Sequence, residues 1–401
     1  MNRRGFLVSS AFLPMAVSKV GAAEFDYSPF DREVETFMKE RSVPGGALAV
    51  SRGGKLVYAK GYGLADRLKK APVTNETLFR IASISKPVTG VAVMKLIVDG
   101  KLKLEDRVLP FIEPLSEGGF PKQMDARWKD VTVAHLLHHT GGWDRDAAFD
   151  PMFRSTKIAR EMKEKAPASA ATVIRYMLRQ PLQFDPGSKY SYSNFGYCLL
   201  GRIIERVTGA RYEEWTKEQI LKPMGITSMQ IGRSRFPNRV KGETRYYMAN
   251  DSRATSVFPG VTAKVAWPYG GFHLEAMDSH GGWIATATDL VRFADGLNRT
   301  EQIGLFSRRD AMRLYQPPPA PVSRKGGKLN AYYYGCGWMV RPSTRKGGRP
   351  NLWHGGSLPG TSSLLVRVRN GVTWAVLFNQ RSKTDGAIDP ALHRASQATF
   401  G

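Results

Sequence analysis

"TSSLLVRVRNGVTWAVLFN", residues 361–379, carries the clearest strand pattern in the chain. Its first half alternates two sets of side chains, and an Asn370-Gly371 pair separates it from a second β-rich run. The two sets are Leu364, Val366 and Val368, and Leu365, Arg367 and Arg369. A period of two is typical of a strand, and Asn-Gly is a preferred hairpin turn. The pattern predicts an antiparallel hairpin near the C-terminus.

The N-terminal part of the chain predicts a second hairpin. Residues 45–63, "GGALAVSRGGKLVYAKGYG", form two β-rich runs around Arg52 and two glycines. Residues 28–41 precede them with apolar side chains at helical spacing, which predicts an amphipathic helix. Strands are therefore expected near both ends of the chain.

The middle of the chain predicts helices, several of which end just before a glycine. The expected helical stretches are residues 88–102, 131–139, 170–180, 194–209, 212–221 and 287–297. We expect an α/β (α+β) fold with an antiparallel β-sheet flanked by helices, built from residues 24–88 and 280–401. A mainly helical domain, residues 89–279, is expected as an insertion between these two parts.

Residues 1–23 differ in composition from the rest of the chain. Arg3-Arg4 precedes an apolar run, and small residues lead to Ala23. These features are typical of a secretory signal peptide, and the paired arginines resemble a twin-arginine signal. No later run reaches the roughly 18 apolar residues of a membrane helix. We expect an exported protein, periplasmic or secreted, with no transmembrane segment after signal cleavage.

The chain is strongly basic, with 59 Lys and Arg against 35 Asp and Glu. No acidic residue lies between Met312 and Thr384, and the basic ones there are residues 313, 324, 325, 328, 341, 345, 346, 349, 367, 369, 381 and 383. An anionic cell-envelope polymer or a carboxylate-bearing substrate would suit this charge, and so would a solvated surface without a partner. We expect no nucleic-acid partner, because the protein is expected to be exported and carries no nucleic-acid-binding motif.

Cysteines and histidines give weaker signals. Cys198 and Cys336 allow one disulfide in an exported protein without requiring it. Cys198 lies in an apolar run, which favours a buried free thiol. His135, His138 and His139 could suggest a metal site. No Glu follows the first histidine as in a zincin helix, so we expect no metal there.

The candidate chemistry begins at "RIASISKPVTG", residues 80–90. At helical spacing Ser83 and Lys86 project from one face, so that the lysine nitrogen can approach the serine hydroxyl. A serine needs a neighbouring base to attack a carbonyl, and a lysine with a lowered pKa can be that base. Alternatively, Ser83 or Ser85 is a helix N-cap. The pair alone is weak evidence, because the same spacing recurs at residues 343–346 before two glycines.

Two further elements carry side chains suited to the same chemistry. Tyr192 and Asn194 follow a tight Asp-Pro-Gly turn and precede a helix. Tyr192 could move a proton to a leaving group, and Asn194 could hydrogen-bond Lys86 or a substrate amide; a simple turn is the alternative. His354 and the two glycines after it precede a strand, where glycines let a substrate backbone approach closely. A structural histidine is the alternative there.

Together and in this order, the three elements resemble those of the class C β-lactamase and penicillin-binding protein family of serine hydrolases. That family carries Ser-x-x-Lys at a helix start, Tyr-x-Asn on a loop, and Lys- or His-x-Gly on a strand near the C-terminus. The stretches at residues 136–143, 281–293 and 358–363 also resemble the family's. The resemblance covers nearly the whole chain after residue 23.

The resemblance implies an α/β domain and an all-helical domain with the site between them. It implies that Ser83 is acylated, with Lys86 and Tyr192 sharing the base and acid roles. The oxyanion hole would be the backbone N–H groups of Ser83 and Ser357. The implied substrate-binding residues are Asn194, His354, Gly355 and Gly356. Water would complete the turnover, and neither a metal nor a cofactor is required.

The chain departs from the classical β-lactamases at the third element. It carries His354 where those enzymes carry a lysine that helps to bind the antibiotic's carboxylate. A histidine is mostly neutral near pH 7 and contacts a carboxylate more weakly. His-x-Gly is more similar to the family's esterases and peptidases, including D-amino-acid-specific aminopeptidases. We therefore expect a serine hydrolase acting on an ester, a peptide or a D-amino-acid derivative; the alternatives are a true class C-like β-lactamase and a non-catalytic envelope-binding protein.

Overall fold

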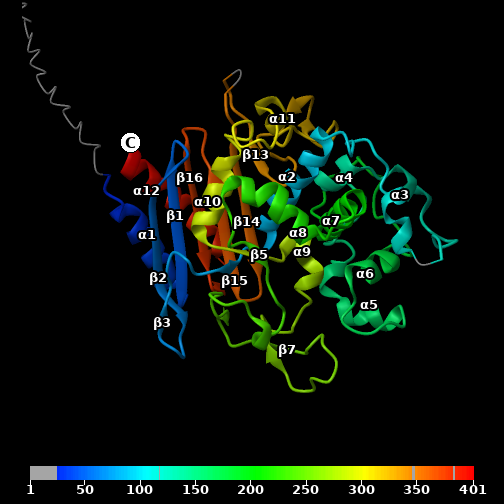
Figure 1. The fold of residues 1–401 in the computed structure, drawn as a ribbon, viewed down its shortest axis with the longest axis horizontal. Helices are drawn as coiled ribbons and strands as arrows, with labels where there is room; N and C mark the ends of the chain where they lie inside the picture. The colour runs from blue at the N-terminus through cyan, green and yellow to red at the C-terminus, as the bar shows by residue number, and fades with distance from the viewer. Residues whose placement is uncertain (1–24, 117, 346–347, 383) are drawn as a thin grey trace, which may run out of the picture.

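The fold is built on an eight-stranded sheet with strand order β12-β13-β14-β15-β16-β1-β2-β3, in which all neighbours are antiparallel (Figure 1). This computed structural model describes residues 25–116, 118–345, 348–382 and 384–401, so the predicted signal peptide lies outside it. The strands are β1 (Gly45–Arg52), β2 (Lys55–Asp66), β3 (Ala71–Pro72), β12 (Tyr333–Tyr334), β13 (Met339–Arg341), β14 (Asn351–Leu358), β15 (Thr361–Arg367) and β16 (Val372–Phe378). Both predicted hairpins are confirmed as β1–β2 and β15–β16.

Apolar side chains cover both faces of this sheet. One face packs against α1 (Ser28–Glu40) and α12 (Ile388–Phe400), which lie side by side at the left of Figure 1. The opposite face packs against α10 (Ala287–Gly296) and the helical region. The alternation in residues 361–379 therefore separates two cores, and Arg367 is buried at its core position, where it donates to the Tyr315 hydroxyl at 3.2 Å.

The predicted helical stretches are confirmed. Besides α1, α10 and α12, the helices are α2 (Ser85–Val98), α3 (Leu109–Ile112), α4 (Val133–Leu137), α5 (Ser155–Glu161), α6 (Ala170–Met177), α7 (Asn194–Thr208), α8 (Tyr212–Thr216), α9 (Asp278–Gly281) and α11 (Arg308–Arg313). The stretch predicted at 212–221 differs in its second half, which is a π-helical turn, Lys217–Leu221. The division into two domains stays a prediction, and α2 runs across its expected boundary at residue 88.

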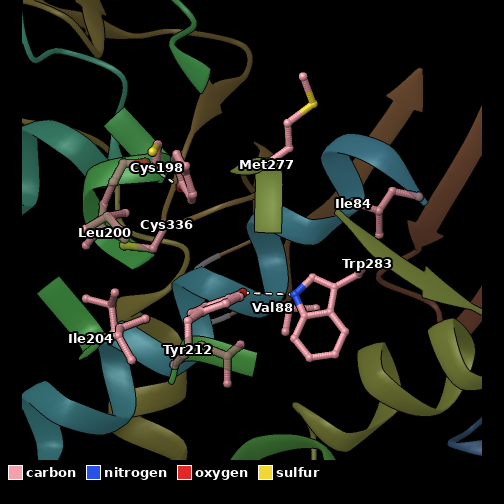
Figure 2. Packing of buried hydrophobic residues seen from close by; sticks show 14 of the residues in the cluster. Ile84, Val88, Cys198, Leu200, Ile204, Tyr212, Met277, Trp283 and Cys336 are labelled. Carbon is pink, nitrogen blue, oxygen red and sulfur yellow. Dashed lines mark hydrogen bonds between the residues drawn. The ribbon is translucent and has the colours of Figure 1, made fainter. Parts of the chain in front are cut away.

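Helix α2 is buried on nearly all sides between the sheet and the other helices. Figure 2 shows part of this core, where Trp283 Nε1 donates to the Tyr212 hydroxyl at 3.0 Å. The two cysteines are free thiols in the same core, and burial raises the pKa of each to about 12. The dense packing fixes the start of α2, where the candidate nucleophile lies.

Short strands and long loops cover the rest of the chain. The short strands are β4 (Phe79–Arg80), β5 (Gln230–Ile231), β6 (Tyr247–Met248), β7 (Arg253–Ala254), β8 (Val265–Ala266), β9 (Trp283–Ala285), β10 (Arg324–Lys325), β11 (Lys328–Leu329) and β17 (Gln380–Arg381). The fully buried Arg80 anchors the loops after β5 and β8, because its guanidinium donates to the carbonyls of Arg233 at 2.8 Å and Pro268 at 2.7 Å. None of the helices among the described residues combines the length and hydrophobicity needed to span a bilayer.

The basic residues of the 313–383 stretch have different environments. The β10–β11 hairpin exposes Arg324, Lys325 and Lys328. Arg367 is buried in the core, and Arg313 lies 3.4 Å from the Asp310 carboxylate. Only part of this positive charge is therefore free to meet a partner in solution.

Candidate active site

Ser83 lies in a turn of 3-10 helix, Ala82–Ile84, directly before α2. Its half-buried side chain lines a cavity of about 610 Å³. Ala82 before it has a φ of +47°, a left-handed conformation that is uncommon for residues other than glycine. The first turn of α2 receives no capping hydrogen bond from a side chain, and the Ser85 hydroxyl instead accepts from the Trp283 backbone N–H at 3.3 Å. The helix-cap alternative for these serines is therefore wrong.

Lys86 is fully buried beside Ser83, one turn further along the helix. Its Nζ lies 3.3 Å from Ser83 Oγ, and it donates to Asn194 Oδ1 at 2.7 Å and to the His280 carbonyl at 2.9 Å. Burial holds the pKa of Lys86 well below its usual range, while the Asp150 carboxylate acts less strongly in the opposite direction. The site thus favours a neutral amine next to the serine.

Tyr192 lies on the loop before α7 and contacts both Lys86 and Ser83. Its ring centroid is 4.7 Å from Lys86 Nζ, and the Arg145 guanidinium lies 4.7 Å from the same ring. Loss of solvent raises the pKa of Tyr192, while hydrogen bonding with Ser83 lowers it to a smaller extent. The phenol therefore carries its proton at neutral pH.

Asn194 begins α7 and links Lys86 to a buried carboxylate. Its Oδ1 accepts from Lys86, and its Nδ2 donates to Asp150 Oδ2 at 2.6 Å. Asp150 Oδ1 also accepts from the Met152 backbone N–H at 3.1 Å. Burial raises the pKa of Asp150, while its hydrogen bonds with Asn194 and Met152 act in the opposite direction. In its ionised form the carboxylate only accepts hydrogen bonds, so it orients the amide with its oxygen toward the lysine.

The end of β14 forms the opposite wall of the cavity. Strand β13 pairs with β14 only over residues 351–353, whereas β15 pairs with it up to Leu358, so the later part of β14 has one edge free of strand pairing. Gly356 packs against the segment before Ser83, where an added Cβ would lie 2.1 Å from the Ile81 carbonyl oxygen. Glycine at this position lets the strand approach the candidate nucleophile.

His354 is buried at this wall, and both of its ring nitrogens are engaged. Its Nε2 lies 2.9 Å from the Tyr334 hydroxyl, and its Nδ1 lies 2.7 Å from the Gly355 carbonyl oxygen. Burial lowers the pKa of His354 to about 3, and the nearby Lys86 acts in the same direction. His354 is therefore a neutral ring held by its neighbours, not a cation facing the cavity.

The structure brings all the predicted site residues together. Those lining the same cavity are Ser83, Tyr192, Asn194, His354, Gly355, Gly356 and Ser357. Lys86 lies directly behind Ser83. Ser83 and Ser357, whose backbone N–H groups are the predicted oxyanion hole, reach the cavity from different elements. Their predicted roles stay predictions.

The three clustered histidines have separate partners. His135 Nδ1 accepts from the Thr132 backbone N–H at 3.2 Å at the start of α4. His138 Nδ1 lies 3.1 Å from the Tyr334 carbonyl oxygen. His139 Nδ1 accepts from the Ser193 backbone N–H at 3.1 Å. Across residues 25–116, 118–345, 348–382 and 384–401, no group of three or more His, Cys, Asp or Glu side chains is placed to hold a metal.

Sequence reasoning missed Asp150, Arg145 and the His280 carbonyl. Asp150 stands in a Phe-Asp-Pro sequence, which recurs at residues 184–186 on the protein surface. Arg145 lines the cavity from the loop after α4. A local pattern does not distinguish the buried copy of Phe-Asp-Pro from the exposed one, because the burial depends on contacts with distant residues.

A sequence model of the family described as Beta-lactamase matches residues 30–398. The chain belongs to the beta-lactamase family. As a member of the beta-lactamase family, it is a serine hydrolase that works through an acyl-enzyme.

Individual relatives agree with membership of the beta-lactamase family. Penicillin-binding protein 4* of Bacillus subtilis (strain 168) is 28% identical over 345 residues, which cover 85% of this chain and 69% of the Bacillus protein. The solved octameric penicillin-binding protein homologue from Pyrococcus abyssi matches with a TM-score of 0.68 at 26% identity, over 93% of this chain and 77% of that chain. The D-amino acid amidase from Ochrobactrum anthropi SV3 shares the fold, with a TM-score of 0.66 at 21% identity over 93% of this chain and 96% of that chain.

Proposed function

We propose that this protein hydrolyses an ester or an amide bond in a small acyl compound, a peptide or a D-amino-acid derivative, with Ser83 as the nucleophile. The observation that carries the proposal is the set of contacts around Lys86 Nζ. A neutral amine has two N–H groups and one lone pair. Asn194 Oδ1 at 2.7 Å and the His280 carbonyl at 2.9 Å take the two N–H groups. The lone pair is left for the Ser83 hydroxyl at 3.3 Å, which is the arrangement of a general base.

In the proposed reaction, Ser83 Oγ attacks the carbonyl carbon while its proton passes to Lys86 Nζ. The carbonyl oxygen becomes an oxyanion, which the N–H groups of Ser83 and Ser357 stabilise. The bond to the leaving group then breaks, the leaving group takes the proton of the Tyr192 phenol, and the phenol takes a proton from the Lys86 ammonium. Water attacks the acyl-serine by the same steps and releases the acid with Ser83 restored.

The environment of His354 supports an ester, peptide or D-amino-acid substrate over a β-lactam. Both ring nitrogens are engaged, and the pKa lowered to about 3 keeps the ring neutral, so His354 adds no positive charge for a carboxylate. The fold shared with a D-amino acid amidase makes D-amino-acid amides one of the proposed substrate classes.

The test compares the parent chain, residues 24–401, with Ser83→Ala on p-nitrophenyl butyrate, D-alanyl p-nitroanilide and nitrocefin. Ser343→Ala is the matched control, because Ser343 begins the other Ser-x-x-Lys spacing. We expect the parent and the control to turn over an ester or an anilide and Ser83→Ala to lose that turnover. Preference for nitrocefin would favour the β-lactamase alternative. Equal behaviour of the parent and Ser83→Ala on all three, with no uptake of a phosphonate probe, would favour a non-catalytic envelope-binding protein.

We further propose that residues 1–23 direct export by the twin-arginine route, on the support of Arg3-Arg4 and the short apolar run after them. Replacing both arginines by lysine in the full chain should keep the protein in the cytoplasmic fraction with its leader uncleaved. Export of that variant at the parental level would contradict the proposal.

A further inference from the structure

We propose that His139 is a positioning residue that holds Tyr192 where its phenol can protonate the leaving group. This inference rests on the function proposed above. His139 is 1% exposed, and the proposal assigns it no contact with the substrate. It acts through the loop that carries Tyr192.

Two hydrogen bonds from one residue hold both neighbours of Tyr192. The His139 carbonyl accepts from the Ser191 backbone N–H at 2.9 Å. The His139 ring accepts, through Nδ1, from the Ser193 backbone N–H at 3.1 Å. The backbone on either side of Tyr192 is therefore fixed to a single residue behind the cavity wall.

The imidazole also packs against the ring that it positions. The ring centroids of His139 and Tyr192 are 4.3 Å apart, and those of His139 and Tyr334 are also 4.3 Å apart. The Tyr334 hydroxyl in turn lies 2.9 Å from His354 Nε2. His139 thus contacts both Tyr192 and Tyr334, and Tyr334 in turn holds His354.

The backbone at His139 is left-handed. Its φ is +58°, in the region where glycine is most usual and where asparagine, aspartate and histidine are enriched over other residues. Because Nδ1 accepts a backbone N–H, the neutral ring carries its proton on Nε2, which is buried without a hydrogen-bond partner among the described residues. Glycine would suit this backbone better but would have neither the acceptor nor the ring.

A displaced Tyr192 should affect one step more than the others. A poor leaving group needs a proton as it departs, whereas p-nitrophenolate leaves readily without one. Loss of the His139 contacts should therefore slow esters of phenol more than esters of p-nitrophenol. A general loss of packing would slow both to the same extent.

The experiment measures kcat and KM for phenyl butyrate and p-nitrophenyl butyrate in four proteins: the parent, His139→Leu, Tyr192→Phe and the double variant. We expect His139→Leu to lower kcat/KM, which reports the acylation step in which the phenol leaves, about 10- to 100-fold for phenyl butyrate and by less than about 3-fold for p-nitrophenyl butyrate. In the Tyr192→Phe background, His139→Leu should add less than about 3-fold, because both changes remove the same contribution. His138→Leu is the matched control, because its ring is buried beside His139 and contacts the Tyr334 carbonyl. Its effect should be the same for both esters.

The inference would be overturned if His139→Leu slowed the two esters equally. It would also be overturned if the double variant were slowed by the product of the two single-variant effects. A Tyr192→Phe variant as active as the parent on phenyl butyrate would overturn it as well. If His139→Leu does not fold, His139→Gly replaces it under the same criteria, because glycine accepts the left-handed backbone and has neither the acceptor nor the ring. Ser83→Ala, assayed in parallel, separates the two proposals: its retained activity would contradict the proposed function, whereas its inactivity with equal ester losses in His139→Leu would contradict the inference alone.

Discussion

The hydrogen bond from Asn194 to Asp150 links a carboxylate to the buried Lys86. Asn194 transmits an orientation, because its amide is held at both ends, by Asp150 and by Lys86. The Asp150 carboxylate also raises the pKa of Lys86, against the larger effect of burial. One carboxylate therefore affects both the geometry and the basicity of the candidate base.

Replacing this carboxylate by an amide, Asp150→Asn, should lower kcat/KM about tenfold or more, as loss of an orienting partner does at other sites. It should also move the acid limb of the pH profile to lower pH. The base acts as the neutral amine, and removing a negative charge lowers the Lys86 pKa further, so the neutral form persists in more acidic solution. The pH dependence of kcat/KM for p-nitrophenyl butyrate measures the shift.

Asp185→Asn is the control, since Asp185 stands in the other Phe-Asp-Pro sequence and is exposed, paired with Arg127. It should leave both the rate and the acid limb unchanged. An acid limb that moves to higher pH in Asp150→Asn would contradict this account of the charge.

Among the site residues, the sequence predicted the contact between Ser83 and Lys86, which are close in the chain, and missed the contacts between residues that are far apart in the chain. Ser83 and Lys86 are three residues apart on one helix, so helical geometry alone brings them together. Asp150 reaches Asn194 across 44 residues, and His354 reaches Tyr334 across 20 residues, through tertiary packing that no local pattern encodes. The neutral, fully engaged state of His354 could be learned only from its burial.

Strand β14 is the element on which the cavity wall depends. Its inner face at Gly356 contacts the segment before Ser83, while the side of Gly355 is open enough that an added Cβ would lie 3.8 Å from the nearest atom. Gly355 therefore has room for a side chain, whereas the adjacent Gly356 does not.

We expect Gly356→Ala to lower the free energy of unfolding by about 1–3 kcal/mol, because its Cβ would overlap the Ile81 carbonyl oxygen at 2.1 Å. Gly355→Ala should change it by well under about 1 kcal/mol. Urea unfolding of the two variants and the parent measures both changes. Equal stability of the two variants would mean that the close approach of β14 to the Ser83 segment is not required.

The elements were predictable where their pattern is local. The Asn370-Gly371 turn and the alternation around it identify β15 and β16, and glycine after residue 208 marks the end of α7. The free edge of β14 was not predictable, because it depends on β13 ending at Arg341, in a loop-rich part of the chain. The buried Arg367 also differs from the usual alternation, because both faces of the sheet are covered.

The whole molecule buries several histidines in their neutral form. Burial lowers the pKa of His138 to about 4 and that of His354 to about 3. It also holds the pKa values of His139 and His280 well below the usual range. In the unfolded chain these side chains take up protons near pH 6.5. The unfolded state therefore binds more protons in mild acid.

The contribution of these histidines to stability should accordingly be fully present above about pH 6.5 and be lost as the pH falls toward the folded-state values, with about 1.4 kcal/mol per pH unit for each such histidine. Urea unfolding at a series of pH values measures this slope. His138→Leu should reduce the slope by the share of one residue. Stability that is constant down to about pH 4.5 would contradict the neutral burial of these histidines.

The position of β1 between β2 and β16 has a consequence for the order of synthesis. Gly46 pairs with Phe378, so β1 cannot complete its pairing until a strand about 330 residues later has been synthesised. Until then the nascent chain carries an incomplete sheet with an open edge, and β14, the cavity wall, is also still to come. A chain synthesised only as far as β13 therefore lacks both the second neighbour of β1 and the cavity wall, and cannot hold an assembled site.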